Sequence, residues 1–367
     1  MLKRMDIRGY RSIKDISLEL RSLNVLIGPN GAGKSNFVSF FKMLNEMMGG
    51  RLQQYIGTSG RGQSILHFGP KVTPQLEGQL EFEADNCTNC YSMRLFHAAG
   101  DTLIFAEEKL AFLRTGYSSP KVVSLGAGHQ ETRIGEEANK GEKTAWVIRR
   151  LLDQCRVYHF HDTSPTARVR QHSYVNDNRW LMPDAGNLAA MLFAYREKSG
   201  VVYRRIVSTL RKIMPEFEDF DLGPSRLNPN DIILNWRKPG HDYLFGPHQI
   251  SDGSLRAMAI CTLFLQPEDD LPDVIILDEP ELGLHPHALE IVAGLIRAAS
   301  SRTQVIAATQ SQILLNYFEP SEVITVEAHD GQSVFRRLEP EQLKDWLEDY
   351  SLGELWQRNV LGGGPLP

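Results

Sequence analysis

The chain has 367 residues, 42% of them hydrophobic and 23% charged, which is typical of a globular protein with a substantial core. Its formal charge of −5 provides no overall attraction to nucleic acid, so a DNA contact would need a local basic face. Four cysteines are too few for a disulfide framework and indicate a reducing compartment. The opening MLKRMDIRGY lacks the apolar run of a signal peptide, and no apolar stretch reaches the ~18 residues of a membrane span. We therefore expect a cytoplasmic protein that has no membrane segment.

The first part of the chain predicts strands followed by one helix. Residues 3–8 and 16–20 are short β-like runs, and residues 24–27 form an apolar strand that ends in glycine. A helix is expected from Lys34 to about Met47, because bulky apolar residues recur there at helical spacing.

The next part of the chain alternates between apolar and polar residues. This pattern covers residues 76–113 and predicts antiparallel strands with solvent on one face. The flanking segments, 49–75 and 114–141, are rich in loop-forming residues, and we predict surface loops there.

The rest of the chain predicts helices and then a strand–helix alternation. Amphipathic stretches predict helices at 144–155, 187–198 and 201–214. Beyond them we expect a helix at 251–265, a strand at 274–277, a helix at 286–299, a strand at 304–308 and a short helix at 341–350. Strands that alternate with helices predict an α/β fold with a parallel or mixed core sheet.

A phosphate-binding loop is the clearest motif. The sequence GPNGAGKS at 28–35 lies between the apolar strand and the first helix, the context that this motif requires. Its glycines let successive N–H groups point at an anion, while Lys34 reaches the β- and γ-phosphates and the Ser35 hydroxyl binds Mg²⁺. We assign ATP contacts to Asn30, Gly31, Ala32, Gly33, Lys34, Ser35 and Asn36.

Two adjacent carboxylates follow a second apolar strand. Asp278 and Glu279 come directly after Val274–Leu277, at the carboxyl end of a strand, where ligands of parallel sheets bind. We predict that Asp278 helps to hold Mg²⁺ and that Glu279 is the catalytic residue that activates the attacking water.

The three motifs GPNGAGKS, SDGSLR at 251–256 and IILDEPELGLHP at 275–286, in this order, resemble the ABC-type P-loop ATPases. The closest resemblance is to the SMC, RecF and OLD-like branch, and within it to compact AAA-family ATPases without a Toprim nuclease domain. The resemblance implies an ABC-type head with a mixed or parallel core sheet, an antiparallel β subdomain and a helical insert.

The segment from Ser251 to Ser254 resembles the ABC signature sequence. In that family the signature contacts the γ-phosphate held by the phosphate loop of the other subunit, so the resemblance implies an ATP-dependent homodimer with nucleotide contacts from Ser251 and Gly253. From the residues alone, Ser251 also fits a helix N-cap.

Other parts of the resemblance are less complete. ABC transporters usually have a histidine where this chain has Gln310; we assign a catalytic role to Gln310, although an amide cannot act as a base. Arg11 resembles the basic residue that approaches nucleotide in RecF-like heads. The family's Q-loop glutamine has three candidates here, Gln63, Gln75 and Gln79, among which the sequence does not decide.

Two further groups of residues stay open. The segment Tyr158–Asp162, with sequence YHFHD, favours a structural or interface role over metal or nuclease chemistry. A set of cations could form a groove for a phosphate backbone or simply be solvated helix faces. This set comprises Arg168, Arg170, Arg179, Arg204, Arg205, Arg211 and Lys212.

Three parts are expected: an N-terminal ATPase lobe at 1–135, a helical insert at 136–250 and a C-terminal ATPase lobe at 251–367. The leading hypothesis is an ATPase that dimerises on ATP and couples closure to DNA or to a separately encoded nuclease or other effector, in DNA repair or antiviral defence. The alternatives are a transporter's nucleotide-binding subunit and a nucleotide-gated scaffold with little turnover.

Overall fold

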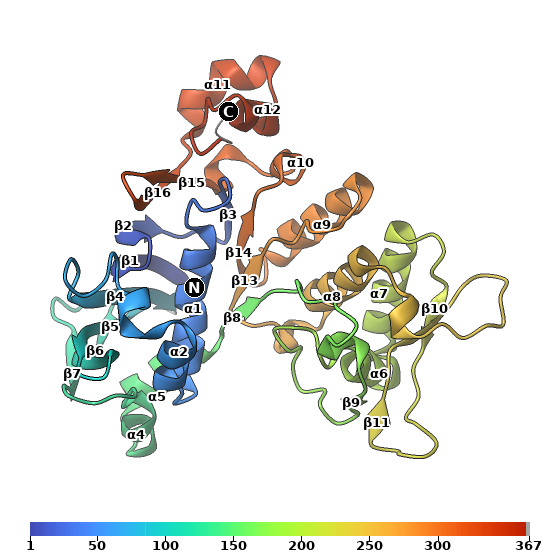
Figure 1. The fold of residues 1–367 in the computed structure, drawn as a ribbon, viewed down its shortest axis with the longest axis horizontal. Coiled ribbons are helices and arrows are strands. Elements are labelled where there is room, and N and C mark those ends of the chain that lie inside the picture. The colour runs from blue at the N-terminus through green and yellow to red at the C-terminus, as the bar shows by residue number, and fades with distance from the viewer. Residues whose placement is uncertain (85, 365–367) are drawn as a thin grey trace.

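The structure is a computed structural model that describes residues 1–84 and 86–364. A six-stranded mixed sheet forms its centre, in the order β16-β15-β3-β14-β13-β8 (Figure 1). Its strands are β3 (Leu23–Ile27), β8 (Cys155–Tyr158), β13 (Val274–Asp278), β14 (Gln304–Thr309), β15 (Val323–His329) and β16 (Gln332–Arg337). All neighbouring pairs are parallel except β15 and β16, which form a hairpin. The predicted mixed α/β fold is confirmed.

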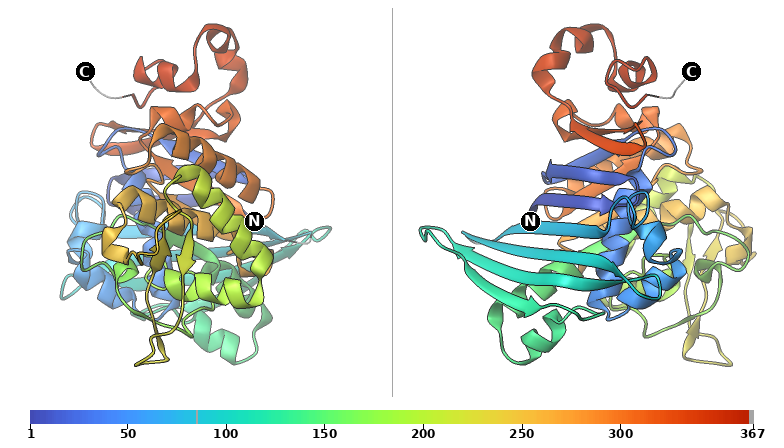
Figure 2. Two further views of the ribbon diagram at one scale, coloured as in Figure 1. Left: turned by 90° about the vertical axis from the view of Figure 1, so that its right-hand side faces the viewer. Right: turned by 60° about the vertical axis from the view of Figure 1, so that its left-hand side comes forward.

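A second, antiparallel sheet lies beside the core sheet, in the order β2-β1-β4-β5-β6-β7. It is built from β1 (Leu2–Tyr10), β2 (Ile13–Glu19), β4 (Gln75–Ala84), β5 (Cys87–Ala98), β6 (Thr102–Arg114) and β7 (Lys121–Gly126). The long strands β5 and β6 extend away from the body of the molecule (Figure 2). The predicted antiparallel strands are thus present, with solvent on the face turned away from α1.

Helix α1 (Lys34–Met48) packs between the two sheets. Its apolar side chains, among them Phe37 and Phe40, are fully buried in one cluster with residues of both sheets. Phe40 meets Tyr10 of β1 edge to face, with 5.4 Å between the ring centroids. Burial on both sides explains why this helix is apolar over most of its circumference.

The opposite face of the core sheet is covered by helices. They are α6 (Leu188–Lys198), α7 (Gly200–Ile213), α8 (Asp252–Leu265) and α9 (Pro286–Ala299), with α10 (Gln312–Leu315) nearby. Alternate residues of each core strand serve the two faces: Leu277 packs with these helices, whereas Ile276 packs with α1. Two small pairs, β10 (Asp219–Asp221) with β12 (Asn235–Arg237) and β9 (Ser173–Tyr174) with β11 (Asp231–Ile232), complete the helical part.

The C-terminal helices are α11 (Pro340–Asp349), which confirms the predicted short helix, and α12 (Leu352–Gln357). Among the residues that the structure describes, no helix combines the length and apolar character that crossing a bilayer requires.

Two predicted loops are wrong. The segment 49–75 contains α2 (Leu52–Thr58) and α3 (Arg61–Ile65), and the segment 114–141 contains β7 and α4 (Ile134–Asn139). The carboxylate of Glu131 accepts hydrogen bonds from the backbone N–H groups of Leu52 (2.8 Å) and Gln53 (2.9 Å) and so caps α2 from a distant part of the chain.

The segment before the helices of the opposite face joins both sheets. Helix α5 (Lys143–Asp153) contacts α1 and β6, and β8 pairs with β13 at the edge of the core sheet.

Candidate nucleotide site

Three neighbouring parallel strands bring the predicted catalytic segments together. Strand β14 lies between β3 and β13, with Ile27 opposite Thr309 and Asp278 opposite Ala308. The phosphate loop after β3, Gln310 after β14 and the carboxylates of β13 therefore emerge at one edge of the core sheet. This is the edge where parallel α/β sheets bind ligands.

The phosphate loop has the backbone that its glycines allow. Gly31 and Gly33 adopt positive φ angles of 79° and 115°, which other residues seldom reach. Gly28 has a different reason: a Cβ there would lie 2.3 Å from the carbonyl oxygen of Val326 on β15. The glycines thus serve both the curl of the loop and its close packing on the sheet.

The start of α1 is braced by two other segments. Asn36 donates a hydrogen bond from its side-chain amide to Ser12 Oγ (2.6 Å), and Ser12 Oγ lies 2.7 Å from Ser333 Oγ on β16. Ser333 also packs against Gly33, where an added Cβ would lie 1.9 Å from Ser333 Oγ. The sequence analysis missed Ser12 and Ser333, whose role depends on contacts between distant segments.

Lys34 is buried, with 4% of its surface exposed, and its ammonium group donates to the carbonyl oxygens of Gly28 (2.6 Å) and Pro29 (3.1 Å). Burial lowers the pKa of Lys34, and the carboxylates of Glu279, Glu281 and Asp278 oppose that shift. The ammonium group is therefore fixed by two carbonyl oxygens of the phosphate loop, and the carboxylates that follow β13 favour its charged form.

Asp278 is the residue best placed to hold a cation. Only 8% of it is exposed, and its Oδ1 atom is buried with no hydrogen-bond partner among the described residues. Burial raises the pKa of its carboxyl group, and the nearby His161 and Lys42 oppose the shift. A buried carboxylate oxygen with an open position, together with the exposed hydroxyl of Ser35, fits the hard oxygen donors that Mg²⁺ prefers.

Glu279 leaves the strand in a strained conformation. Its φ angle is 44°, in the left-handed region, while its backbone N–H donates to the carbonyl oxygen of Ala308 (2.8 Å). At Glu279 the backbone therefore turns out of the extended conformation of β13. Side chains held in such sparsely populated conformations are frequent at functional sites.

Gln310 lies beside the phosphate loop. Its backbone N–H donates to Glu281 Oε1 (2.8 Å), and burial raises the pKa of Glu281. Gln310 shares an open hollow of about 540 Å³ with Pro29, Asn30 and the C-terminal helix α12, through Trp356 and Gln357. The involvement of α12 was not predicted by the sequence analysis.

The signature segment begins α8. Ser251 caps this helix, since its Oγ accepts a hydrogen bond from the N–H of Ser254 (3.1 Å). The N-cap that the sequence allows at Ser251 is therefore present. The apolar face of α8 packs on the opposite side of the core sheet from α1. Among the described residues, no hydrogen bond joins segment 251–254 to segment 28–36.

Arg11 has a strained backbone (φ 49°) that is held by hydrogen bonds at both peptide groups, with Ile65 and His67. Its guanidinium donates to the hydroxyl of Tyr55 (3.5 Å), and its buried Nε has no partner among the described residues. The nucleotide contact of Arg11 stays a prediction.

None of the three glutamines considered for the Q-loop follows a core strand. Gln63 lies in α3, whereas Gln75 and Gln79 lie in β4 of the antiparallel sheet. The segment that leads from the core sheet into the helical part instead follows β8 and carries His159 and His161. His161 Nε2 donates to the backbone carbonyl of Asp278 (3.2 Å).

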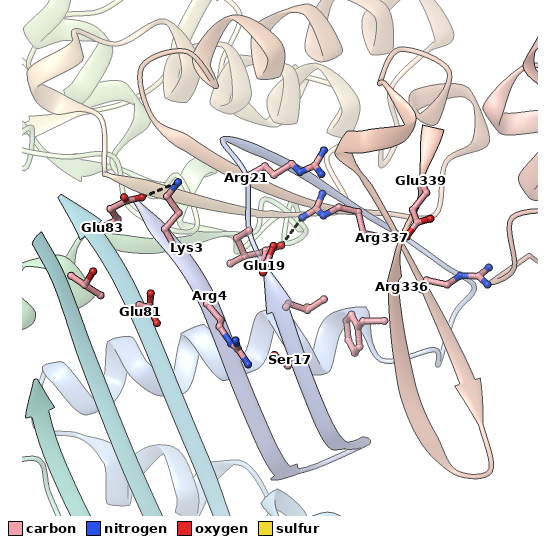
Figure 3. A pocket seen from close by; sticks show the side chains of 14 residues that line it. Lys3, Arg4, Ser17, Glu19, Arg21, Glu81, Glu83, Arg336, Arg337 and Glu339 are labelled. Atoms are coloured by element: carbon pink, nitrogen blue, oxygen red, sulfur yellow. Dashed lines mark hydrogen bonds and ion pairs between the residues drawn. The ribbon is translucent and has the colours of Figure 1, made fainter. Parts of the chain in front are cut away.

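A hollow of about 820 Å³ lies elsewhere, between the antiparallel sheet and the β15–β16 hairpin (Figure 3). Its cations are engaged by the protein itself. Lys3 pairs with Glu83 (2.9 Å), and Arg337 donates to Glu19 O (2.8 Å) and to Asn24 Oδ1 (2.6 Å). With carboxylates interleaved among its cations, this hollow is a poor phosphate pocket.

Arg170 is not available to a basic groove in the helical part. Arg170 is only 5% exposed and donates to backbone carbonyls and to Asp252 Oδ1 (2.8 Å), so it is a structural residue. Arg168 pairs with Asp184 (3.1 Å), and Arg211 donates to Glu218 O (2.7 Å).

Two protein-family models match separate parts of the chain. A family model described as AAA ATPase domain matches residues 1–94, and a second, described as AAA domain, putative AbiEii toxin, Type IV TA system, matches residues 158–316. Comparison of the sequence with curated proteins gives no significant match.

Solved structures with similar folds include two SMC heads. One is bound to the C-terminal winged-helix domain of ScpA; it has a TM-score of 0.61 and 15% identity, with 94% of this chain and 99% of that chain covered. The other, from Pyrococcus furiosus, has an extended coiled coil and is bound to the C-terminal domain of ScpA; its TM-score is 0.58 at 15% identity, covering 95% and 98%. At such identity the likeness shows the fold. Both family matches, with the motifs gathered at one sheet edge, indicate an AAA ATPase, and the fold is similar to that of SMC heads.

Proposed function

We propose that two copies of this chain close on ATP and Mg²⁺, hydrolyse the ATP, and couple closure to DNA or to a partner effector such as a separately encoded nuclease. The observation that carries the proposal is the meeting of Lys34, Asp278, Glu279 and Gln310 at the carboxyl ends of three adjacent strands. A division into two ATPase lobes and a helical insert is part of the proposal.

Each residue has a role that its chemistry allows. The loop N–H groups and Lys34 would hold the phosphates, and Ser35 and Asp278 would hold Mg²⁺, which when bound neutralises charge on the β- and γ-phosphates. Glu279 would accept the proton of the attacking water, and the Gln310 amide would orient that water. Asn30, Gly31, Ala32, Gly33 and Asn36 would complete or support the loop, and Arg11 would contact the nucleotide from its side.

A dimer accounts for the position of the signature. Ser251 and Gly253 open α8, on the other side of the core sheet from α1, and no hydrogen bond ties them to the phosphate loop of the same copy. A second copy would supply this segment to the γ-phosphate. The two SMC heads are bound to domains of another protein, ScpA, which supports a protein partner for this chain as well. The pathway that we propose, DNA repair or antiviral defence, rests on the resemblance to RecF- and OLD-like ATPases.

The first experiment measures steady-state ATP hydrolysis with and without double-stranded DNA, together with the mass in solution with and without ATP. Lys34→Ala should abolish turnover and the ATP-dependent dimer, whereas Lys344→Ala, on the exposed face of α11, should change neither. Stimulation by DNA would support direct coupling to DNA, and a dimer that turns over without stimulation would favour a protein effector. Absence of both turnover and dimer would overturn the proposal, and ATP binding without turnover would favour the scaffold. Co-purification with a membrane subunit would favour the transporter.

A further inference from the structure

Glu281 comes two residues after Glu279, and its side chain reaches across to the neighbouring core strand. Its Oε1 atom accepts a hydrogen bond from the backbone N–H of Gln310 (2.8 Å), the first residue after β14. The loop that carries Glu281 is itself ordered by a turn, since the N–H of Leu284 donates to the Glu281 carbonyl oxygen (3.1 Å). A carboxylate that follows β13 therefore fixes the backbone at the end of β14.

The side chain of Gln310 is positioned only through its backbone. Its amide group has no hydrogen bond to any residue that the structure describes. The backbone beside it is held firmly: the N–H of Ser311 donates to Oγ1 of the fully buried Thr309 (2.9 Å), and Ser311 Oγ caps α10 by accepting from the N–H of Leu314 (3.1 Å). Loss of the bond to Glu281 would therefore move the amide that we assign to the attacking water.

The segment after Gln310 is packed against the C-terminal helix α12. The N–H of Gly353 in α12 donates to Asn316 Oδ1 at the end of α10 (2.7 Å). A Cβ on Gly353 would lie 2.4 Å from the carbonyl oxygen of Gln312, so the two helices touch through their backbones. Helix α10 is thus fixed on one side by α12, and Glu281 is the contact at its beginning.

The charge of Glu281 is part of the candidate nucleotide site. Its carboxylate is one of three, with Glu279 and Asp278, that favour the charged form of Lys34. Burial raises the pKa of Glu281, and the hydrogen bonds at the end of β14 oppose the shift. Its other oxygen, Oε2, is buried and has no hydrogen-bond partner among the described residues. A buried carboxylate with an unsatisfied oxygen costs folding free energy, so a structural brace alone explains it poorly.

We propose that Glu281 is a positioning residue, whose Oε1 atom holds the Gln310 backbone so that the Gln310 amide lies at the attacking water. This inference rests on the proposed ATPase function and deepens it. The essential property is the hydrogen-bond acceptor and not the negative charge, because Glu281 acts on Gln310 through one N–H group. A glutamine side chain keeps an acceptor at the same distance from the backbone, an aspartate is one CH₂ group shorter, and an alanine has no acceptor.

The first measurement needs no nucleotide. It is the hydrogen-exchange rate of the Gln310 amide in the nucleotide-free protein, resolved to single residues. Glu281→Ala removes the acceptor of this N–H, so the exchange should become faster by about 10-fold or more. Glu281→Gln should keep the rate within about 3-fold of wild type. The matched control is Glu290→Ala on α9, where the side chain is 63% exposed, and it should change nothing.

The second measurement is ATP turnover, together with affinity for a fluorescent ATP analogue. Glu281→Ala should lower kcat by about 10-fold or more, because the group that orients the water is displaced. Nucleotide affinity should change by less than about 3-fold, since the phosphate loop supplies most of the binding. Glu281→Gln should keep kcat within about 3-fold of wild type. In a Gln310→Ala background, which already lacks the amide, adding Glu281→Ala should lower kcat by less than about 2-fold further.

The outcomes separate this inference from the proposed function. Independent losses of kcat in Glu281→Ala and Gln310→Ala that multiply in the double variant would overturn the role of Glu281 while leaving the ATPase intact. Wild-type exchange of the Gln310 amide in Glu281→Ala, or equal losses of kcat in the alanine and glutamine variants, would do the same. Turnover that survives Lys34→Ala would instead overturn the proposed site itself. If Glu281→Ala does not fold, Glu281→Asp replaces it with the same expected changes, and wild-type exchange and kcat there would contradict the inference.

Discussion

Gly253 lies directly against the backbone of Gly283: a Cβ on Gly253 would stand only 2.0 Å from the Gly283 carbonyl oxygen. This contact joins the start of α8 to the loop that follows Asp278 and Glu279. Gly283 itself needs glycine, because its φ angle is 70° and a Cβ there would meet the guanidinium of Arg256 at 2.8 Å. The signature and the acidic strand are thus in direct backbone contact within one copy.

Gly253→Ala should therefore push the start of α8 away from this loop. We expect a loss of about 1–3 kcal/mol in the free energy of unfolding, because the neighbour is rigid backbone. The ATP-dependent dimer should weaken as well, while nucleotide affinity stays near wild type. Urea denaturation and mass in solution with ATP measure the two effects. Gly294→Ala, in the exposed middle of α9 with open space around it, should stabilise the protein by about 0.5–1 kcal/mol.

Glu279→Gln should separate ATP binding from hydrolysis. The amide keeps the size of the side chain but cannot accept the proton of the attacking water, so kcat should fall by about 100-fold or more. The ATP-bound dimer should then accumulate, as measured by size-exclusion chromatography with light scattering. The matched control is Glu290→Gln on α9, where the side chain is 63% exposed. Unchanged turnover in Glu279→Gln would remove this residue from the mechanism.

Arg256→Lys tests the connection between the histidine segment and α8. An ammonium group cannot reproduce the hydrogen bonds that the planar guanidinium gives to the carbonyl oxygens of Phe160, His161 and Leu282. We expect a loss of about 1–3 kcal/mol in unfolding free energy and a lower kcat, with ATP affinity preserved. Arg205→Lys, on the exposed face of α7, is the control. Equal kcat for the two lysine variants would show that the hydrogen bonds of Arg256 are not needed for turnover.

A buried carboxyl group far from the site predicts a pH effect on stability. Glu108 has no exposed surface and accepts hydrogen bonds from Tyr91 (2.9 Å) and from the N–H of Arg133 (3.1 Å), with His129 Nε2 3.7 Å away. Burial raises the pKa of Glu108 above its ordinary value of 4.5, against the hydrogen bonds from Thr132, Arg133 and Tyr91 and the charge of His129. The folded protein thus binds this proton more tightly than the unfolded chain does.

The contribution of Glu108 to the free energy of unfolding should therefore be greatest below its ordinary pKa. It should fall as pH rises through the raised pKa of the folded protein and stay constant above it. Glu108→Gln removes this dependence, so the variant should gain stability relative to wild type as pH rises above the ordinary Glu108 value of 4.5. Urea denaturation across that range measures the difference. The neighbouring Glu107→Gln, at a side chain 41% exposed, should track wild type. A pH dependence in Glu108→Gln that parallels wild type would contradict the expectation.

The phosphate loop and the acidic strand were predictable because each is a local pattern. GPNGAGKS and the run ending in Asp278-Glu279 contain both the loop-forming glycines and the side chains proposed for catalysis in consecutive residues. Family matches and the fold support the ATPase class that these motifs indicated. The individual site roles stay predictions.

The place of His161 could not be predicted in this way. It depends on the pairing of β8 with β13, two strands separated by more than a hundred residues, and no local pattern encodes that pairing. Helix α2 was missed for the same reason, since the Glu131 carboxylate that caps it comes from beyond the antiparallel strands. The contact of Ser333 with Gly33 could not be predicted either, because the two residues are far apart in the sequence.

The strand order of the core sheet has a consequence for how the protein is made. Both neighbours of β3, the strands β14 and β15, come from residues 304–329, so the phosphate loop has no flanking strand until that late part of the chain is available. Such long-range pairing is slow and leaves apolar strand faces uncovered in the meantime. An incomplete chain that already contains GPNGAGKS should therefore be unable to hold nucleotide, and ATP would stabilise only molecules whose two ends have already come together.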